Sequence, residues 1–248
     1  MRGRYYKKIN KIPLRNFRGI NLGSGPTGPK DWINVDLINK NYFLKSLAVH
    51  LSKTFNVINN GTMRYFLSST PPNYLRLNLA KGRLPFPPLS FKYCYTSHFL
   101  EHLEVWQMRE VLGEVYRLLV YGGVCRIVIP DLEILTLAYF RYKQGNYDAF
   151  TNLHLSKDPV IEMNEHFGNI YDINTKIPDL LRPLAYRQLR KYGHKFMIDY
   201  DFLKSLLLNA GFDHVSKQKF RCGEVPDLMV LDLDGRQFES MYIEAFKK

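Results

Sequence analysis

The stretch INLGSGPTGPKDWINVDL, which starts at Ile20, constrains the fold more than any other part of the chain. Two short apolar runs flank a loop that contains Gly23, Gly25 and Gly28, and the second run ends on Asp36. The spacing G-x-G-x-x-G is typical of a loop that follows a strand of an α/β sheet and approaches a ligand through its backbone. A carboxylate at the end of the next strand can accept both hydroxyls of a ribose.

The distance between the loop and the acid decides which ligand class fits. Gly25 and Asp36 are 36 − 25 = 11 positions apart, and Pro26 and Pro29 lie between them. A dinucleotide-binding unit needs a full helix there and places its acid about 20 residues further on. The spacing therefore excludes a nicotinamide dinucleotide. The connection is short even for parallel strands, which usually need about a dozen residues or more.

The remaining pattern predicts strands that alternate with helices and then an antiparallel ending. Predicted strands cover residues 19–22, 32–36, 74–79, 92–96, 124–129, 212–220, 225–231 and 238–245. A long helix is predicted over 98–120, ended by Gly122 and Gly123, and a second follows a cap at Asp199 or Asp201. A turn is expected at Asp234. We therefore expect an α/β fold with a Rossmann-like, open, mostly parallel sheet, an antiparallel edge hairpin and helices on both faces.

Length and composition limit the possible domain organisation and the cellular compartment of the protein. The chain has 248 residues, 46% of them hydrophobic, and no apolar run approaches the roughly 18 residues of a membrane span. We expect a basic extension over residues 1–18 and one domain over 19–248. The first residues lack the apolar segment of a secretory signal. Three scattered cysteines suit a reducing compartment, so a cytoplasmic protein is predicted.

The charge pattern indicates an anionic partner or a solvated surface. The net charge is +12, and basic residues gather in the first 18 positions and again between 182 and 195. The simpler interpretation is a solvated tail and a solvated helix face. The alternative is a surface for phosphates, acidic glycans, RNA or anionic lipid, so peripheral membrane contact through the basic N-terminus is one of the hypotheses.

Five segments in order resemble one enzyme family. They are NLGSG (21–25), WINVDL (32–37), LPFPPLSFKYCYTSHFLEHL (84–103), YGGVCRIVIPDLE (121–133) and YGHKFMIDYDFLKSLLLNAGF (192–212). The chain resembles the class I S-adenosylmethionine (SAM)-dependent methyltransferases, and in particular small predicted methyltransferases associated with sugar and surface-glycan biosynthesis. That resemblance implies SAM as the cofactor and methyl transfer as the reaction.

The resemblance also implies positions for the cofactor. Gly23 and Gly25 would line the methionine moiety, Asp36 would hold the ribose, and Asn78 would lie near the adenine. The full predicted set of cofactor-binding residues is Asn21, Gly23, Ser24, Gly25, Asp36, Asn78, Leu79, Ser97 and His98. This sequence departs from the family at Asn21 and Asn78, where many relatives have acids.

The segment HFLEHL offers side chains for the reaction. His98, Glu101 and His102 stand at i, i+3 and i+4, so one face of the predicted helix would hold all three. In the first interpretation His98 or His102 is the general base that accepts a hydroxyl proton. In the second, the three side chains bind a divalent metal, with a spacing similar to the Glu-x-x-Glu-His site of some O-methyltransferases. In the third, Glu101 and His102 only brace the start of the helix.

Two further residues are catalytic candidates. His194 belongs to a segment that follows the variable region and could cover the pocket, or it is a surface histidine. Asp131 follows a predicted strand, where it could contact substrate or orient a histidine, or it caps the next helix.

The predicted acceptor is a saccharide or glycan intermediate, methylated on oxygen. The resemblance implies a substrate-recognition insertion around residues 131–198. Aromatic side chains in this insertion could stack on sugar rings: Tyr139, Phe140, Tyr142, Tyr147, Phe150, Phe167 and Tyr171. The alternatives are an RNA methyltransferase, which the net charge favours, and a SAM-binding module without catalysis.

Overall fold

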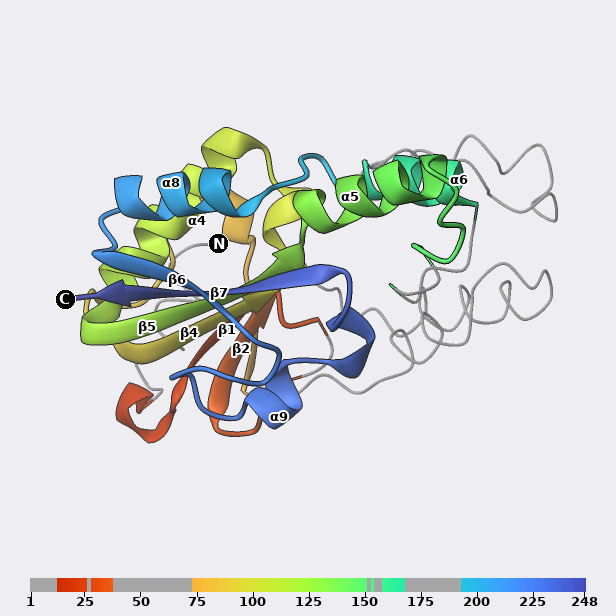
Figure 1. Cartoon of the computed structure of the whole chain (residues 1–248). Helices are drawn as coiled ribbons and strands as arrows, with labels where there is room; N and C mark the ends of the chain where they lie inside the picture. The colour runs from red at the N-terminus through yellow and green to blue at the C-terminus, as the bar shows by residue number, and fades with distance from the viewer. Residues whose placement is uncertain (1–12, 26–27, 38–72, 151–152, 154–157, 168–192) are drawn as a thin grey trace, which may run out of the picture.

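One open sheet of seven strands organises the computed structural model, which describes residues 13–25, 28–37, 73–150, 153, 158–167 and 193–248. The strand order is β3-β2-β1-β4-β5-β7-β6 (Figure 1). The strands are β1 (Gly19–Leu22), β2 (Trp32–Asp36), β3 (Tyr74–Arg76), β4 (Phe91–Ser97), β5 (Leu119–Pro130), β6 (His214–Gln218) and β7 (Ser240–Lys247). β7 runs antiparallel to both of its neighbours, and the other described pairings are parallel. The expected fold class is confirmed.

The short connection after β1 does join two parallel neighbours. β1 and β2 pair in continuous register from Gly19 opposite Trp32 to Leu22 opposite Val35. Nine residues, 23–31, link them, and the described part of this link contains no helix. The backbone turns back at once through Gly23, whose φ is 69°. An immediate reversal explains how so short a link serves a parallel pair.

The two faces of the sheet have different covers (Figure 1). Helices α4 (Val105–Leu118) and α8 (Tyr200–Asn209) cover one face and contribute to the largest apolar cluster. On α4, Met108, Val111, Leu112 and Val115 recur at 3- and 4-residue steps and are buried. On the other face, α9 (Leu228–Leu231) packs on a smaller cluster around Trp32. α5 (Leu132–Lys143) and α6 (Pro159–His166) extend away from the sheet beyond the end of β5.

The long helix predicted over 98–120 was wrong at both ends. A 3-10 turn, η3 (Leu100–His102), precedes α4, and the chain enters β5 directly after Leu118. Gly122 and Gly123 lie inside β5, so they do not end the helix. Gly122 has a φ of 71°, close to the shift in register between β4 and β5. The paired glycines therefore accommodate an irregularity in a strand.

The C-terminal part also differs from the prediction. Residues 225–231, predicted as a strand, end in α9, and Asp234 begins the 3-10 turn η5 (Asp234–Arg236) where a hairpin turn was expected. The antiparallel partner of β7 is therefore β6, joined to it by residues 219–239. The remaining short helices are η1 (Leu14–Asn16) and η2 (Leu79–Lys81), the latter ending the predicted strand 74–79 early. None of the helices in the described ranges is both long and apolar enough for a membrane span.

Candidate functional site at the carboxyl edge of the sheet

The glycine turn folds back on the end of β2. The amides of Gly23 and Ser24 donate to the carbonyl of Val35, at 2.8 and 3.2 Å. The amide of Gly25 donates to Asp36 Oδ2 at 2.8 Å, and both glycines have left-handed φ values, 69° and 59°. Left-handed φ is costly for residues with a Cβ, which explains glycine at both positions. The carboxylate of Asp36 therefore lies against the turn, at the edge where β1 and β2 end.

Close packing explains the other features of this motif. A Cβ on Gly23 would lie 2.7 Å from the Cβ of Phe99, so the turn is in contact with the segment that follows β4. A Cβ on Gly28 would lie 1.9 Å from Asn34 Oδ1, so the third glycine makes room for a side chain of β2. Asn21 donates from Nδ2 to the same oxygen at 3.2 Å. Asn21 and Asn34 thus form a buried polar pair beneath the turn, and Gly28 leaves room for it.

Two predicted cofactor-binding residues, Asn78 and Leu79, follow the end of β3. Asn78 is the N-cap of η2 and accepts a hydrogen bond from the amide of Ala80 at 3.1 Å. Leu79 is buried in the core cluster that α4 covers. The structure therefore gives both residues a structural function, and their contact with a cofactor stays a prediction.

A tight turn after β4 brings three predicted residues together. Ser97 ends β4, and His98 follows with a φ of 48°. His98 Nδ1 lies 3.3 Å from Glu101 Oε1, and His102 Nε2 lies 4.0 Å from the same oxygen. The single helix face predicted for them does not exist, because η3 and the left-handed residue replace it. The expected proximity is nevertheless present.

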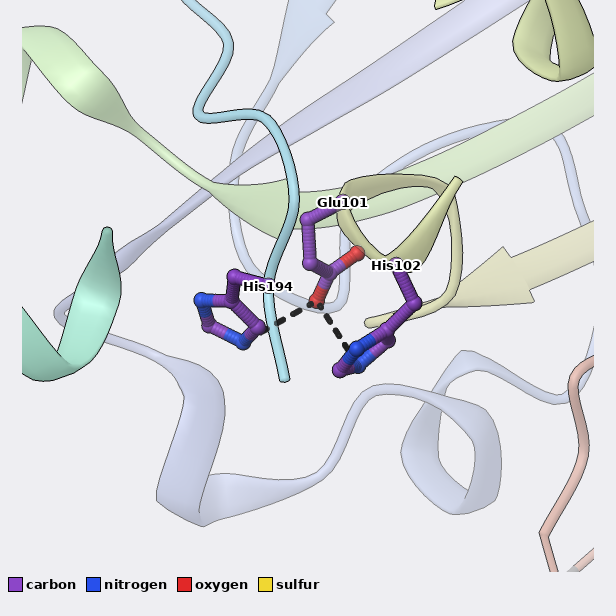
Figure 2. A group of neighbouring side chains, drawn as sticks. All are labelled: Glu101, His102 and His194. Atoms are coloured by element: carbon purple, nitrogen blue, oxygen red, sulfur yellow. Dashed lines mark ion pairs between the residues drawn. The ribbon is translucent and has the colours of Figure 1, made fainter. Parts of the chain in front are cut away.

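His194 joins this group from a distant part of the chain (Figure 2). The amides of Lys195 and Phe196 donate to the carbonyl of Glu101, at 2.7 and 3.2 Å, and so hold the segment beside η3. His194 Nε2 lies 3.9 Å from Glu101 Oε1, and its ring centroid is 5.0 Å from that of His102. The carboxylate of Glu101 therefore points between the two imidazole rings.

Burial controls the electrostatics of this group. The side chain of Glu101 is fully buried, and neither carboxylate oxygen receives a hydrogen bond from the described residues. Burial raises the pKa of Glu101 to about 8, because desolvation penalises the charged form. The same effect, together with the nearby His102, lowers the pKa of His194 to about 4. Burial, with Arg236 as a second cause, also lowers the pKa of His98 well below its usual value.

An outer layer of residues supports the cluster, and the sequence patterns did not reveal it. His166, at the end of α6, contacts Glu239 at 3.3 Å, and Arg236 contacts the other oxygen of Glu239 at 3.1 Å. Burial opposes protonation of His166, but the bonds to Glu239 and to the carbonyl of Glu162 raise its pKa overall. Burial would raise the pKa of Glu239, yet His166 and the neighbouring positive charges lower it to about 2. Glu239 is therefore ionised at neutral pH, and its negative charge stabilises the protonated form of His166.

Ser240 completes that layer. Its Oγ lies 2.9 Å from His98 Nε2 and shares a hydrogen bond with it. His166, Arg236, Glu239 and Ser240 come from segments without a motif, and only the antiparallel course of β7 brings the last three to this edge. No spacing in the sequence could have indicated these contacts.

Asp131 caps the helix that follows it, which was the second of the two predictions for this residue. It is the N-cap of α5, and its Oδ1 accepts a hydrogen bond from the amide of Glu133 at 2.9 Å. Burial is the main cause that raises the pKa of its carboxyl. A function of Asp131 toward substrate stays a prediction.

Two hollows lie beside this edge. One of about 420 Å³ is lined by residues of α5 and α8, with Lys217 of β6. A second of about 370 Å³ shares Lys217 and reaches Ser240. Neither includes a residue of the glycine turn or of the Glu101 cluster. Perturbed titratable groups are better indicators of chemistry than volume, so we place the candidate site at the cluster.

Comparisons with known proteins find solved structures of similar shape at low sequence identity. No family model matches the sequence, and no curated protein matches it. Solved structures that are similar in shape include a SAM-dependent methyltransferase from Thermotoga maritima, with 16% identity, a TM-score of 0.47 and coverage of 97% of this chain and 85% of that one. Another is from Archaeoglobus fulgidus, with 15% identity, a TM-score of 0.42 and coverage of 100% and 95%. A third, described as a putative S-adenosylmethionine-dependent methyltransferase from Listeria monocytogenes, has 14% identity, a TM-score of 0.43 and coverage of 99% and 98%. With scores below 0.5, these likenesses say nothing about activity, and the fold assignment rests on strand order and register.

Proposed function

We propose that the chain is a SAM-dependent methyltransferase. The observation that supports this best is the contact between the Gly25 amide and the Asp36 carboxylate at the carboxyl edge of β1 and β2. In open α/β sheets, ligands bind at that edge. The connection offers no helix N-terminus among its described residues for a pyrophosphate, which favours a nucleoside cofactor without phosphate.

The proposed cofactor site follows the turn toward β4. Gly23, Ser24 and Gly25 would contact the methionine moiety, and Asp36 the ribose hydroxyls. Asn78 would lie near the adenine, and Leu79 is a further proposed cofactor contact. The contact between Gly23 and Phe99 supports this order, because it joins the cofactor turn to the segment that includes His98.

The proposed reaction is methyl transfer to a hydroxyl that loses its proton. Burial keeps His98 and His194 neutral near pH 7, which is the state that can accept a proton. His102 is the third candidate base and is partly exposed, with about a third of its side chain accessible. These three imidazoles surround one carboxylate, so a base and a group that orients it are both at hand.

The proposed acceptor is a saccharide or glycan intermediate. Phe140, Tyr147 and Phe167 are exposed on and around α5 and α6, where they could stack on a sugar ring. Phe150 instead belongs to a small apolar cluster with Tyr139 and Tyr142 around it. Tyr171 lies outside the described residues. The exposed rings, rather than the whole aromatic set, support this acceptor.

The RNA alternative depends on the basic segments, most of which lie outside the described residues. Of those within them, Arg18 contacts Asp227 at 3.0 Å and Lys195 contacts Glu104 at 3.5 Å. These ion pairs favour the simpler interpretation, in which the two cations belong to the solvated surface of the protein. Binding of RNA that weakens steeply with salt would support the alternative, and indifference to salt would exclude it. A cytoplasmic location and docking on a membrane through residues 1–18 both stay proposals. Deletion of those residues would test the docking.

Calorimetric titration of SAM and then of S-adenosylhomocysteine into the full chain tests the proposal. We expect micromolar affinity that falls at least tenfold in Asp36→Ala. Asp31→Ala is the matched control, because Asp31 is an exposed acid at the opposite end of β2. Absence of binding by the folded wild-type chain would refute the proposal. Binding without turnover on a panel of sugar nucleotides and RNA would favour a non-catalytic module.

A further inference from the structure

The carboxylate of Glu101 and two imidazole nitrogens lie within 4.8 Å of one another. Figure 2 shows Glu101 Oε1 pointing between the rings of His102 and His194, with ion-pair distances of 4.0 and 3.9 Å. The ligands of a tetrahedral zinc ion are about 3.3 Å from each other, given bonds of about 2.0–2.1 Å. A shift of well under 1 Å per ring would therefore suffice.

The hydrogen bond on the far side of His194 fixes which nitrogen faces the carboxylate. His194 Nδ1 lies 3.0 Å from the carbonyl oxygen of His166. A carbonyl can only accept, so Nδ1 bears the hydrogen, and in the neutral ring Nε2 presents its lone pair to Glu101. A backbone carbonyl bonded to the outer nitrogen is the usual support of a metal-binding histidine.

Glu101 provides a second, independent observation. Its carboxylate is fully buried, receives no hydrogen bond from the described residues, and faces a nitrogen lone pair. Two electron-rich atoms in such a position need a cation or a proton between them. We propose that Glu101, His102 and His194 bind one divalent transition-metal ion, with zinc or cobalt as the class of ion.

The choice of ion and the open position follow from the ligands. Two imidazoles and a carboxylate are the donor set of an open zinc site, whereas magnesium prefers oxygen ligands. The exposed fraction of the side chain is 0% for Glu101, 34% for His102 and 21% for His194, so the site opens on the histidine side. A water or an acceptor hydroxyl would take the fourth position.

The structure favours His194 over His98 as the third ligand. The predicted set was His98, Glu101 and His102, but His98 Nε2 is engaged with Ser240 and its other nitrogen lies 3.3 Å from Glu101. His98 would therefore support Glu101 from outside the site. Metal binding does not depend on SAM, whereas any effect of the ion on an acceptor hydroxyl rests on the proposed function.

Titration of the chelator-treated full chain with Co²⁺, followed by visible absorption, and with Zn²⁺ by calorimetry, tests the proposal. We expect one ion per chain and an affinity that falls at least tenfold in both Glu101→Gln and His194→Ala. His214→Ala is the matched control, because His214 is exposed on β6 and should leave the affinity unchanged.

Circular dichroism of each variant shows whether it is folded. Absence of a bound ion in the wild type would overturn the proposal and would mean that Glu101 holds a proton instead. Binding that survives both substitutions would also overturn it, because the ion would then bind elsewhere on the chain.

Discussion

Two buried clusters of ionisable side chains lie against this sheet, and they differ in how their polar atoms are satisfied. On the face covered by α9, the guanidinium of Arg126 is fully buried and all five of its N–H groups are engaged. Asp232 accepts two of these bonds, at 3.2 and 2.6 Å, and Glu244 accepts another at 3.4 Å. At the carboxyl edge, Glu101 is equally buried, but it faces imidazole nitrogens and accepts no hydrogen bond from the part of the chain that the structure describes.

The remaining partners of the first cluster make the contrast sharper. Glu244 also accepts from the amides of Glu224 and Val225, and Asp232 from the amide of Arg221. The network therefore fixes residues 219–239 on the sheet, and no ligand is needed to complete it. Glu101 lacks such partners within the described ranges, and an uncompensated buried group in a native structure indicates function rather than stability.

The largest effect should come from breaking the satisfied cluster. Arg126→Met would leave the carboxylates of Asp232 and Glu244 buried without their cation, and should lower the free energy of unfolding by about 3–5 kcal/mol. Urea denaturation measures this. Arg109→Met, at an exposed position of α4, is the control and should change stability by less than about 0.5 kcal/mol. Equal effects of the two substitutions would remove the distinction between the clusters.

The second effect should come from completing the unsatisfied cluster. Zinc at a free concentration a hundredfold above its dissociation constant should stabilise the wild type by about 2.7 kcal/mol. Thermal unfolding with and without chelator measures this gain. Glu101→Gln should abolish it and His214→Ala should retain it. A gain that persists in Glu101→Gln would contradict the assignment of ligands.

A smaller loss of stability is expected at the contact between Ser240 of β7 and His98. Ser240→Ala removes the hydroxyl that bonds His98 and leaves a buried ring nitrogen unsatisfied, which should cost about 1–2 kcal/mol. Chemical denaturation at neutral pH measures this. Ser205→Ala, on the exposed face of α8, is the comparison and should be neutral or slightly stabilising. If both variants behave alike, the contact between Ser240 and His98 adds nothing to stability.

The smallest effect should be that of Glu101→Gln in metal-free protein. The amide has nearly the same shape and replaces a carboxyl that no donor among the described residues satisfies, so stability should change by less than about 1 kcal/mol. The same denaturation series as for Arg126→Met gives the comparison. A loss as large as that of Arg126→Met would show that Glu101 is a structural residue like Asp232.

The strands on either side of the cofactor turn could be predicted because the glycine and acid motif and the flanking apolar runs are both local signals. Gly23, Gly25 and Asp36 lie within 14 residues, and an apolar run on each side specifies β1 and β2. Residues 225–231 could not be assigned, because a short apolar run fits a buried strand as well as a helix. In the structure, Leu228 and Leu231 pack on Trp32 and Tyr95, so tertiary contacts decide the outcome.

The candidate site was predictable only in part. His98, Glu101 and His102 are close in sequence, so almost any tight local structure would bring them together. His166 and Glu239 are 73 residues apart, and only the course of the whole chain makes them neighbours. The predicted helix start at residue 98 was also wrong. His98 has a left-handed backbone conformation, and η3 follows it before α4 begins.

The direction of β7 has a practical consequence for labelling this protein. The strand begins at Ser240, beside the histidines, and ends at Lys247, whose ammonium donates to the carbonyls of Tyr116 and Leu119. At about 3.4 Å per residue, these ends are roughly 24 Å apart. Figure 1 shows the last residue at the side of the sheet away from α5 and α6. A fluorophore or an immobilisation tag placed after Lys248 would therefore leave the histidine-rich edge free for binding measurements.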